Sequence, residues 1–182
     1  MRASLRRMIG LTVGWLSVLS VLALPAPAAE PKLIGAYRDW NAFILEEASG
    51  PVCWMVSRPK RQEGEFTRRG DVFLLVVHRP AERSFDVVNF IAGYPFAERS
   101  EVLIQVGRHG FKLFSDGEQA WARDDKTDRA IAQAMTQGSL LKVQGTSLRG
   151  NRTIDTFSLA GSGAAYQAIG SACADRAPPP AP

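Results

Sequence analysis

Asp71-Val72-Phe73-Leu74-Leu75-Val76-Val77-His78 is the stretch of sequence that decides the fold class. It is apolar at successive positions, and successive side chains of a strand point to opposite faces of a sheet. Its short length and its β-branched residues favour a strand over a helix. The stretch therefore predicts a central strand that is covered on both faces.

Further strands are predicted after this stretch. Phe85–Ala92 and Val102–Val106 are short and β-rich, and turn residues separate them, as in a sandwich or barrel. The pair Asp116-Gly117 readily adopts the positive φ of a tight turn. It therefore predicts a hairpin between residues 110–114 and 118–122.

A second hairpin is predicted between Leu140–Leu148 and Thr153–Leu159. Polar and apolar residues alternate in the second strand, yet Ile154, Phe157 and Leu159 cannot share one face of a regular strand. We therefore expect a bulge or a twist in residues 153–159.

Two short helices are predicted in the second half of the chain. Asp125 or Thr127 can cap a helix that runs to Gln137 and ends at Gly138, and Ala164–Cys173 forms the other. Gly50-Pro51 and Pro59–Arg69 are expected to be loops. The predicted fold is all-β: an antiparallel β-sandwich or flattened barrel of about 8–9 strands, with two short helices covering an end or edge of the sheet.

The N-terminus is typical of a secretory signal peptide. Arg2, Arg6 and Arg7 precede the uncharged apolar run Ile9–Leu24, and small residues follow it. Cleavage is expected before Ala29. An uncleaved membrane anchor is the alternative, but the apolar run is shorter than the about 20 residues that a bilayer needs.

Three regions follow from these patterns: a signal peptide at 1–28, a β-sandwich domain at 29–174 and a disordered, Pro-rich tail at 175–182. No transmembrane segment is expected after cleavage. Removal of residues 1–28 takes away three arginines and no acids, so the net charge falls from +4 to +1. Acids are interleaved with the remaining basic residues, which makes nucleic acid an unlikely partner on charge grounds.

The two cysteines, Cys53 and Cys173, are expected to form a disulfide. In an oxidising compartment an even number of cysteines is more often a disulfide than a metal site or a nucleophile. The bond would close a loop of about 120 residues and stabilise the fold by about 4 to 5 kcal/mol in the chain-entropy model.

No pattern in the sequence predicts catalysis. A Ser-His-Asp site needs a histidine base, and the mature chain offers only His78 and His109, neither beside a nucleophile motif. We expect His78 to lie at a sheet edge and His109 in an exposed turn. No closely spaced ligands indicate a metal site and no motif indicates a cofactor. The sequence predicts a protein that is not an enzyme and has no cofactor.

The aromatic residues could fill a core or line a ligand cavity, and the core is favoured. Tyr94-Pro95-Phe96 is the segment that we expect to be exposed and to form an interaction surface. The aromatic residues considered for the core are Trp40, Trp54, Trp121, Phe43, Phe96, Phe111, Phe114 and Tyr94.

Several local patterns, in their order, resemble the invasion-associated locus B family of exported α-proteobacterial proteins. They cover residues 35–173 and include Asp39-Trp40, Cys53-Trp54-Met55, Arg79-Pro80, Gly93-Tyr94-Pro95-Phe96, Asp116-Gly117, Ala120-Trp121, residues 145–150 and residues 155–161 leading to Cys173. The resemblance implies an all-β extracytoplasmic domain without an established enzymatic activity. Many relatives place another cysteine soon after the first tryptophan, where Asn41-Ala42-Phe43 stand here, so a second disulfide is not expected.

These observations predict a non-enzymatic envelope protein that serves as a periplasmic or surface interaction module. Its location would be the periplasm, with outer-membrane association or secretion as further possibilities, and its partner an envelope or host-surface protein. The sequence leaves the identity of the partner and the oligomeric state open. The alternative is a periplasmic carrier that binds a small molecule or lipid in an aromatic-lined β cavity.

Overall fold

A computed structural model describes residues 29–66 and 68–174 of the 182-residue chain. The predicted signal peptide at 1–28 and the predicted tail at 175–182 lie outside the described residues. Within residues 29–66 and 68–174, no helix has the length and apolar character needed to span a membrane.

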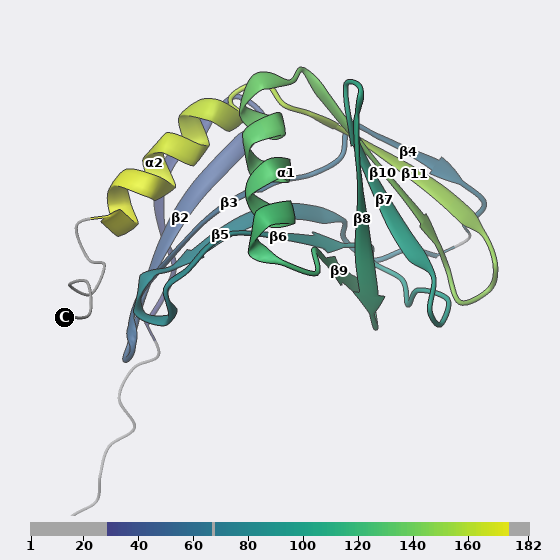
Figure 1. Ribbon diagram of the computed structural model, residues 1–182, viewed down its shortest axis with the longest axis horizontal. Coiled ribbons are helices and arrows are strands. Elements are labelled where there is room, and N and C mark those ends of the chain that lie inside the picture. The colour runs from purple at the N-terminus through teal and green to yellow at the C-terminus, as the bar shows by residue number, and fades with distance from the viewer. Residues whose placement is uncertain (1–28, 67, 175–182) are drawn as a thin grey trace, which may run out of the picture.

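The described chain forms one antiparallel sheet of 11 strands and two α-helices (Figure 1). The order of strands across the sheet is β1-β2-β3-β5-β6-β9-β8-β7-β10-β11-β4. The strands are β1 (Lys32–Tyr37), β2 (Trp40–Glu47), β3 (Gly50–Ser57), β4 (Arg61–Gly64), β5 (Phe73–Arg79), β6 (Ser84–Ile91), β7 (Glu101–Val106), β8 (His109–Asp116), β9 (Gln119–Trp121), β10 (Leu140–Thr146) and β11 (Arg152–Ser158). The helices are α1 (Asp125–Gln137) and α2 (Ser162–Ala174), and a 3₁₀ turn, η1, spans Pro80–Glu82.

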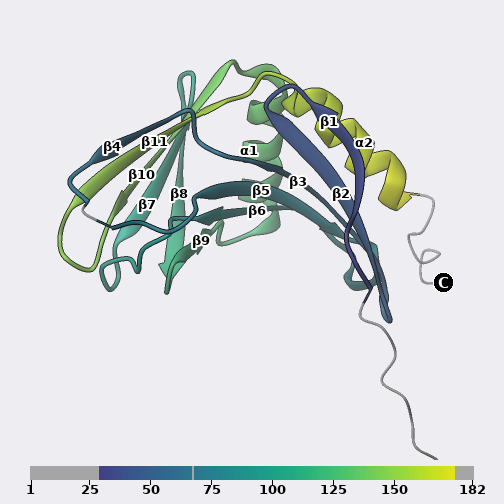
Figure 2. The same ribbon diagram turned by 180° about the vertical axis from the view of Figure 1, so that it is seen from behind.

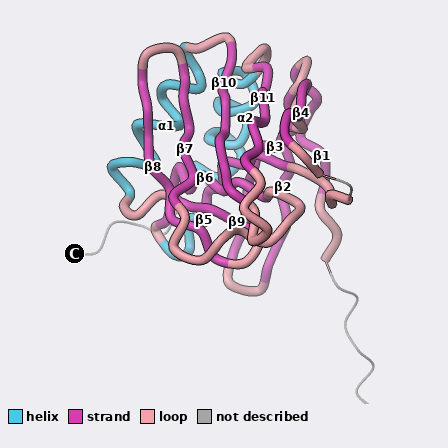
Figure 3. Tube along the Cα trace, turned by 90° about the vertical axis from the view of Figure 1, so that its right-hand side faces the viewer, coloured by secondary structure: helices cyan, strands magenta, loops and turns pink. Residues whose placement is uncertain are grey.

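The sheet curls so that its two halves share one core. Phe90 of β6 packs edge-to-face on Phe157 of β11 with ring centroids 6.2 Å apart, although four strands lie between β6 and β11 in the sheet. The Trp40 indole Nε1–H of β2 also donates to the Ser158 carbonyl of β11 at 3.0 Å. Figure 3 shows β8, β7, β10 and β11 side by side with the helices behind them. The all-β prediction is therefore confirmed, in the form of a flattened barrel whose edge strands β1 and β4 remain unjoined.

Two segments expected to be loops are part of the sheet, which has 11 strands and not the expected 8–9. Gly50-Pro51 begins β3 and pairs with Glu46 and Glu47 of β2. Arg61–Gly64, within the charged segment 59–69, forms β4 and pairs with β11. β4 lies at the sheet edge, where charged residues are common, so it has no apolar periodicity to reveal it.

Both predicted helices are present. The N-cap of α1 is Asp124 and neither of the expected caps, Asp125 and Thr127. The Asp124 carboxylate accepts from the Thr127 N–H at 2.8 Å. α1 ends at Gly138 as predicted, but the reason is close packing, because a Cβ there would lie 2.6 Å from a Val106 methyl. α1 packs on β6, and α2 packs on β2 and β3. Figures 1 and 2, seen from opposite sides, place α1 on one face of β5 and β6.

Both predicted hairpins are present, and of the two alternatives expected for residues 153–159, a bulge or a twist, the bulge is absent from Thr153–Ser158. β8 and β9 meet at Gly117, which has φ +57°, and β10 pairs with β11 in unbroken register from Leu140 opposite Ser158 to Thr146 opposite Arg152. The inward positions of β11 are Thr153, Asp155 and Phe157, whereas Ile154 lies on the other face. A regular strand is possible because the sheet buries the Asp155 carboxylate in place of an apolar side chain.

The aromatic residues divide between the core and the opposite face of the sheet. Trp40, Tyr94 and Phe96 are buried in the core, and Phe111 packs partly against it. Phe43, Trp54, Phe114 and Trp121 are only half-buried and are not among the residues packed on the core. The prediction that these aromatic residues fill the core is therefore right for the four that pack in or against it, and wrong for the four on the opposite face.

Candidate functional site

A cleft of about 1150 Å³ lies where the segments around β4, β6 and the β10–β11 turn meet. We call it the Tyr94 cleft. Pockets for small ligands are typically about 300 to 1000 Å³. The cleft is therefore large enough for a stretch of polypeptide. Its lining consists of Glu65, Phe66, Arg68, Arg69, Gly70, Gly93, Tyr94, Pro95, Glu118, Ser147, Leu148, Arg149, Asn151 and Thr153.

A buried ion pair between Arg69 and Asp155 supports the cleft. Nη1 and Nη2 of Arg69 donate to Oδ1 and Oδ2 of Asp155 at 2.8 and 2.6 Å, and the two side chains are 3% and 0% exposed. Burial raises the pKa of Asp155, whereas the hydrogen bonds and charge of Arg69 act in the opposite direction. The third Arg69 donor, Nε, binds the Ala92 carbonyl at 2.7 Å. Arg69 therefore holds the segment after β4 against the end of β6 and the inner side of β11.

The same guanidinium orders two aromatic side chains of the cleft. Its central carbon lies 4.9 Å from the ring centroid of Tyr94 and 5.4 Å from that of Phe66. The Tyr94 hydroxyl forms a hydrogen bond with the Thr153 hydroxyl at 2.6 Å. Burial raises the pKa of Tyr94, so its hydroxyl stays protonated at neutral pH. One buried cation thus positions an aromatic wall made of side chains from two distant segments.

The expectation that Tyr94, Pro95 and Phe96 are all exposed is wrong for the two aromatic residues. Tyr94 is 8% exposed and Phe96 6%, and their rings pack edge-to-face with centroids 5.2 Å apart. Gly145 makes room for both rings, because a Cβ there would lie 2.7 Å from each. Pro95 alone is exposed. Tyr94 and Pro95 nevertheless line the cleft, while Phe96 lies in the core beneath it.

The rim of the cleft combines exposed apolar side chains with unpaired charges. Phe66 and Leu148, which are 41% and 61% exposed, belong to a group of only six large apolar residues that are exposed in the described chain. Arg68 and Arg149, with Glu65 and Glu118, have no ion-pair partner within residues 29–66 and 68–174. The rim can therefore contact apolar groups and charges of both signs.

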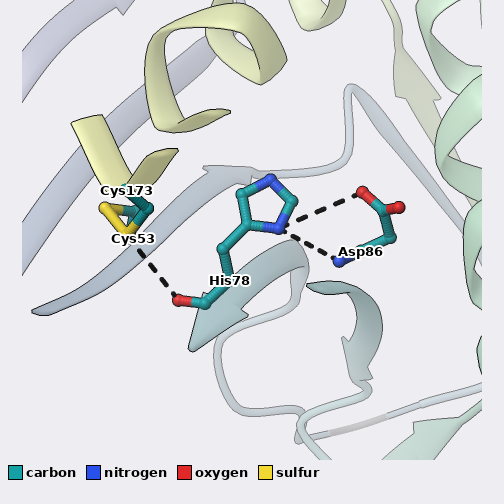
Figure 4. The surroundings of a disulfide bond; sticks show 4 residues. All are labelled: Cys53, His78, Asp86 and Cys173. Atoms are coloured by element: carbon teal, nitrogen blue, oxygen red, sulfur yellow. Dashed lines mark hydrogen bonds and ion pairs between the residues drawn. A yellow bond between two sulfur atoms is a disulfide. The ribbon is translucent and has the colours of Figure 1, made fainter. Parts of the chain in front are cut away.

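His78 lies in a buried cluster and not at a sheet edge, so that expectation is wrong. β5 is an inner strand, and the His78 side chain is 5% exposed. Its Nδ1 accepts the Asp86 backbone N–H at 3.0 Å (Figure 4). Burial lowers the pKa of His78, and the nearby Asp86 carboxylate acts against this effect. Since Nδ1 is an acceptor, the imidazole is neutral.

Asp86 connects this histidine to the two helices. Its carboxylate accepts from the Tyr166 hydroxyl of α2 and lies 3.9 Å from Arg129 of α1. Burial and Asp86 raise the pKa of Tyr166 to about 12. His109, in contrast, is exposed as expected, although it is the first residue of β8 and not part of the turn before it. The role that the geometry gives to His78 and Asp86 is to fasten α1 and α2 to the sheet.

Asp128 of α1 provides a pH test of this interface. Its carboxylate accepts the Val88 N–H at 2.8 Å, and burial raises its pKa from 3.8 to about 6. Because the carboxyl pKa is higher in the folded state than in the unfolded state, ionisation of Asp128 lowers the free energy of unfolding above about pH 6. This loss disappears as the pH falls from about 6 toward 3.8. Asp128→Asn keeps the acceptor and removes the charge. We expect it to raise the free energy of unfolding by about 2 kcal/mol at pH 8 and by almost nothing at pH 4.

Urea unfolding of the wild type and Asp128→Asn at both pH values measures this difference. The comparison cancels the opposite contribution of His78, whose lowered pKa makes the fold less stable as the pH falls below 6.5. An equal gain at pH 8 and pH 4 would show that folding does not raise the pKa of Asp128.

The structure contains the predicted disulfide between Cys53 of β3 and Cys173 of α2 (Figure 4). The two Cα atoms are 6.1 Å apart, and both residues are buried. The bond joins the C-terminal turn of α2 to the sheet next to His78, whose carbonyl lies 4.0 Å from the Cys173 sulfur. Within the described residues, no group of three or more His, Cys, Asp or Glu side chains is arranged to hold a metal ion.

Four residues that line or support the cleft were not found from the sequence: Phe66, Arg69, Leu148 and Asp155. Arg69 and Phe66 lie in a charged segment that resembles a solvated loop. A signal for Asp155 was nevertheless present, because the apolar residues of 153–159 do not share one face. When apolar residues of a strand do not share one face, a polar residue can occupy an inward position, and a buried polar side chain needs a hydrogen-bond partner.

Comparisons with known proteins agree with the fold. The family profile described as "Invasion associated locus B (IalB) protein" matches residues 40–170. The crystal structure of invasion associated protein B from Bartonella henselae is similar, with a TM-score of 0.53 and 19% sequence identity over 80% of this chain and 98% of that chain. At this identity the likeness shows the fold alone. No curated protein matches the sequence. Because the family profile spans most of the described domain, this chain belongs to the invasion associated locus B family.

Proposed function

We propose that this protein is exported and acts in the cell envelope as a non-enzymatic interaction module, which binds a polypeptide partner in the Tyr94 cleft. Export is supported by the basic and then apolar sequence of residues 1–28. It is also supported by the buried Cys53–Cys173 disulfide, since such bonds persist in oxidising compartments. Periplasmic or surface exposure of the domain follows from this proposal.

The observation that carries the binding proposal is the position of Phe66 and Leu148. These exposed side chains come from segments far apart in the sequence and line the same cleft. Exposed apolar groups gathered within a polar rim are typical of interaction sites. Arg68 and Arg149 line the cleft together with two acids, Glu65 and Glu118. A polypeptide offers apolar side chains and both signs of charge, and it fits this rim better than a uniformly anionic ligand does.

The non-enzymatic part of the proposal is supported by the use of His78. The Nδ1 of this histidine accepts a backbone hydrogen bond, and its side chain is buried against the helices. The interior of the barrel is packed, with the Phe90 ring against the rings of both Phe96 and Phe157. This packing supports binding in the cleft over a carrier cavity inside the sheet.

A position-specific crosslinking experiment tests the cleft. A photo-reactive residue at position 148 of the full-length chain, expressed in its own host, should crosslink one defined polypeptide, which is then purified. Phe66→Ser and Leu148→Ser should each weaken its binding at least about tenfold. Leu103→Ser and Leu140→Ser are matched controls, because these leucines are 41% and 52% exposed and lie outside the cleft.

The controls should bind like the wild type. Equal weakening by all four substitutions, or crosslinking of the same polypeptide from position 103, would contradict the cleft assignment. A thermal-shift screen with lipids and small metabolites covers the other class of ligand. Stabilisation by one of these classes, together with no polypeptide crosslink, would favour a carrier, because binding to the folded state raises its stability.

A further inference from the structure

The sheet has an apolar face that neither helix covers. Cross-strand register places Trp54 of β3 between Phe43 of β2 and Val77 of β5. It also aligns Leu75 of β5 with Asn89 of β6, and Asn89 with Trp121 of β9. We call this surface the outer face. It crosses β2, β3, β5, β6 and β9 and reaches Phe114 of β8, which lies opposite Trp121.

The helices lie on the other side of these strands. The core positions of β5, such as Leu74 and Val76, are fully buried, whereas Leu75 and Val77 are half-buried and are not packed on the core. In Figure 2, β5 and β6 lie in front of α1, and in Figure 1 the order is reversed. The stretch 71–78 is apolar on both faces, but residues 29–66 and 68–174 cover only one of them. A cover for the second face would therefore come from outside these residues.

The aromatic side chains of the outer face are ordered against one another. Phe43 and Trp54 stack with centroids 5.5 Å apart and planes at 17°, and Phe114 packs on Trp121 at 5.7 Å. Six strands spaced about 4.8 Å apart, with two or three alternate positions on each, outline a face of about 25 Å by 20 Å, or about 500 Å². Most of its positions are apolar, whereas Asn89 of β6 and Gln119 of β9 are polar. With a polar border it reaches the about 800 Å² per partner of a standard interface.

The charges at the border favour a second copy of this chain as the cover. One end of the face carries the ion pair of Arg58 with Asp71 at 2.9 Å, and the other carries the pair of Arg79 with Glu47 at 3.1 Å. Both ends thus present both signs. A twofold axis that runs across the strands brings one end of the face onto the other, so each copy places its cations near the anions of its partner.

We propose that the outer face is the interface of a twofold homodimer, centred on Trp54, Leu75 and Val77. The face lies outside the binding contacts assigned to Phe66 and Leu148, so the dimer and the proposed function stand or fall separately. Half-exposed aromatic residues such as Trp54 and Trp121 are typical anchors of such interfaces.

The mass of the full-length chain, expressed with its own N-terminal segment and purified after any processing, tests the dimer. Sedimentation and light scattering between about 1 and 100 µM should show twice the monomer mass with dissociation on dilution, since interfaces of this size have micromolar or tighter affinities. Dilution should also move the tryptophan emission to longer wavelength as Trp54 and Trp121 become hydrated. Val77→Glu, which buries an unpaired charge, should raise the dissociation constant at least about 100-fold.

Leu103→Glu is the matched control, since Leu103 is an exposed residue of β7 outside the outer face. It should dimerise like the wild type, and circular dichroism should show both variants to be folded. Phe43→Ser, nearer the sheet edge, replaces Val77→Glu if the latter does not fold. A wild-type monomer at every concentration would overturn the proposal. A dimer that resists both outer-face substitutions, or a monomer that binds vesicles of phosphatidylcholine and phosphatidylglycerol through Trp54, would also overturn it.

Discussion

Replacing both cysteines with alanine is expected to lower the free energy of unfolding by about 4 to 5 kcal/mol. Cys53 and Cys173 are 120 residues apart, and without the bond the unfolded chain gains the conformational freedom of that whole loop. Alanine is preferred to serine because both sites are buried, and a hydroxyl there would need a new hydrogen-bond partner. Urea unfolding of the oxidised wild type and the double variant gives the difference directly.

The effect should also be local. α2 is held to the sheet by the disulfide at its C-terminal turn and by the Tyr166–Asp86 hydrogen bond. Amide exchange in α2 should therefore accelerate in the double variant more than exchange in β10 and β11, which pair along their whole length. Each single substitution should match the double variant, since either one removes the bond. Equal stability of the oxidised wild type and the variants would refute a stabilising role for the disulfide.

Asp155→Leu is expected to destabilise the fold by about 3 to 5 kcal/mol. The substitution leaves the Arg69 guanidinium, which is 3% exposed, without a counter-charge in the interior. The same variant should also lose binding at the Tyr94 cleft, because Arg69 positions the rings of Tyr94 and Phe66. Urea unfolding and partner affinity, measured on the same preparations, give the two effects.

The double variant Arg69→Met with Asp155→Leu separates the buried charge from packing. It should be more stable than Asp155→Leu alone, because replacing a whole buried pair with apolar residues costs less than breaking it. Its cleft should still bind weakly, since no cation stacks on Phe66. A double variant as unstable as the sum of the two single variants would show that Arg69 and Asp155 do not act as a pair.

His78 and Tyr94 show where reasoning from the sequence met its limit. The position of His78 at the end of an apolar run was clear, but its burial depends on α2, whose contacts with the sheet join residues about 90 positions apart. Tyr94 belongs to a turn-like Gly-Tyr-Pro-Phe segment, and turns are usually exposed. Its ring is buried because Gly145, on a strand 51 residues later, leaves the space for it. Neither contact leaves a periodic pattern in the local sequence.

The sequence by itself determined the class of fold, the two helices, both hairpins, the pairing of the two cysteines and the family. These features depend on local signals: apolar periodicity, Asp-Gly turns, helix caps and an even cysteine count. Only the tertiary structure decided that Arg69 reaches Asp155, that Phe66 and Leu148 line one cleft, and that the stretch 71–78 has one uncovered face. A strand that is apolar on both sides indicates that two covers exist. Which of the two faces the chain's own helices and strands cover depends on how the sheet curls. The curl is set by pairings between strands far apart in the sequence.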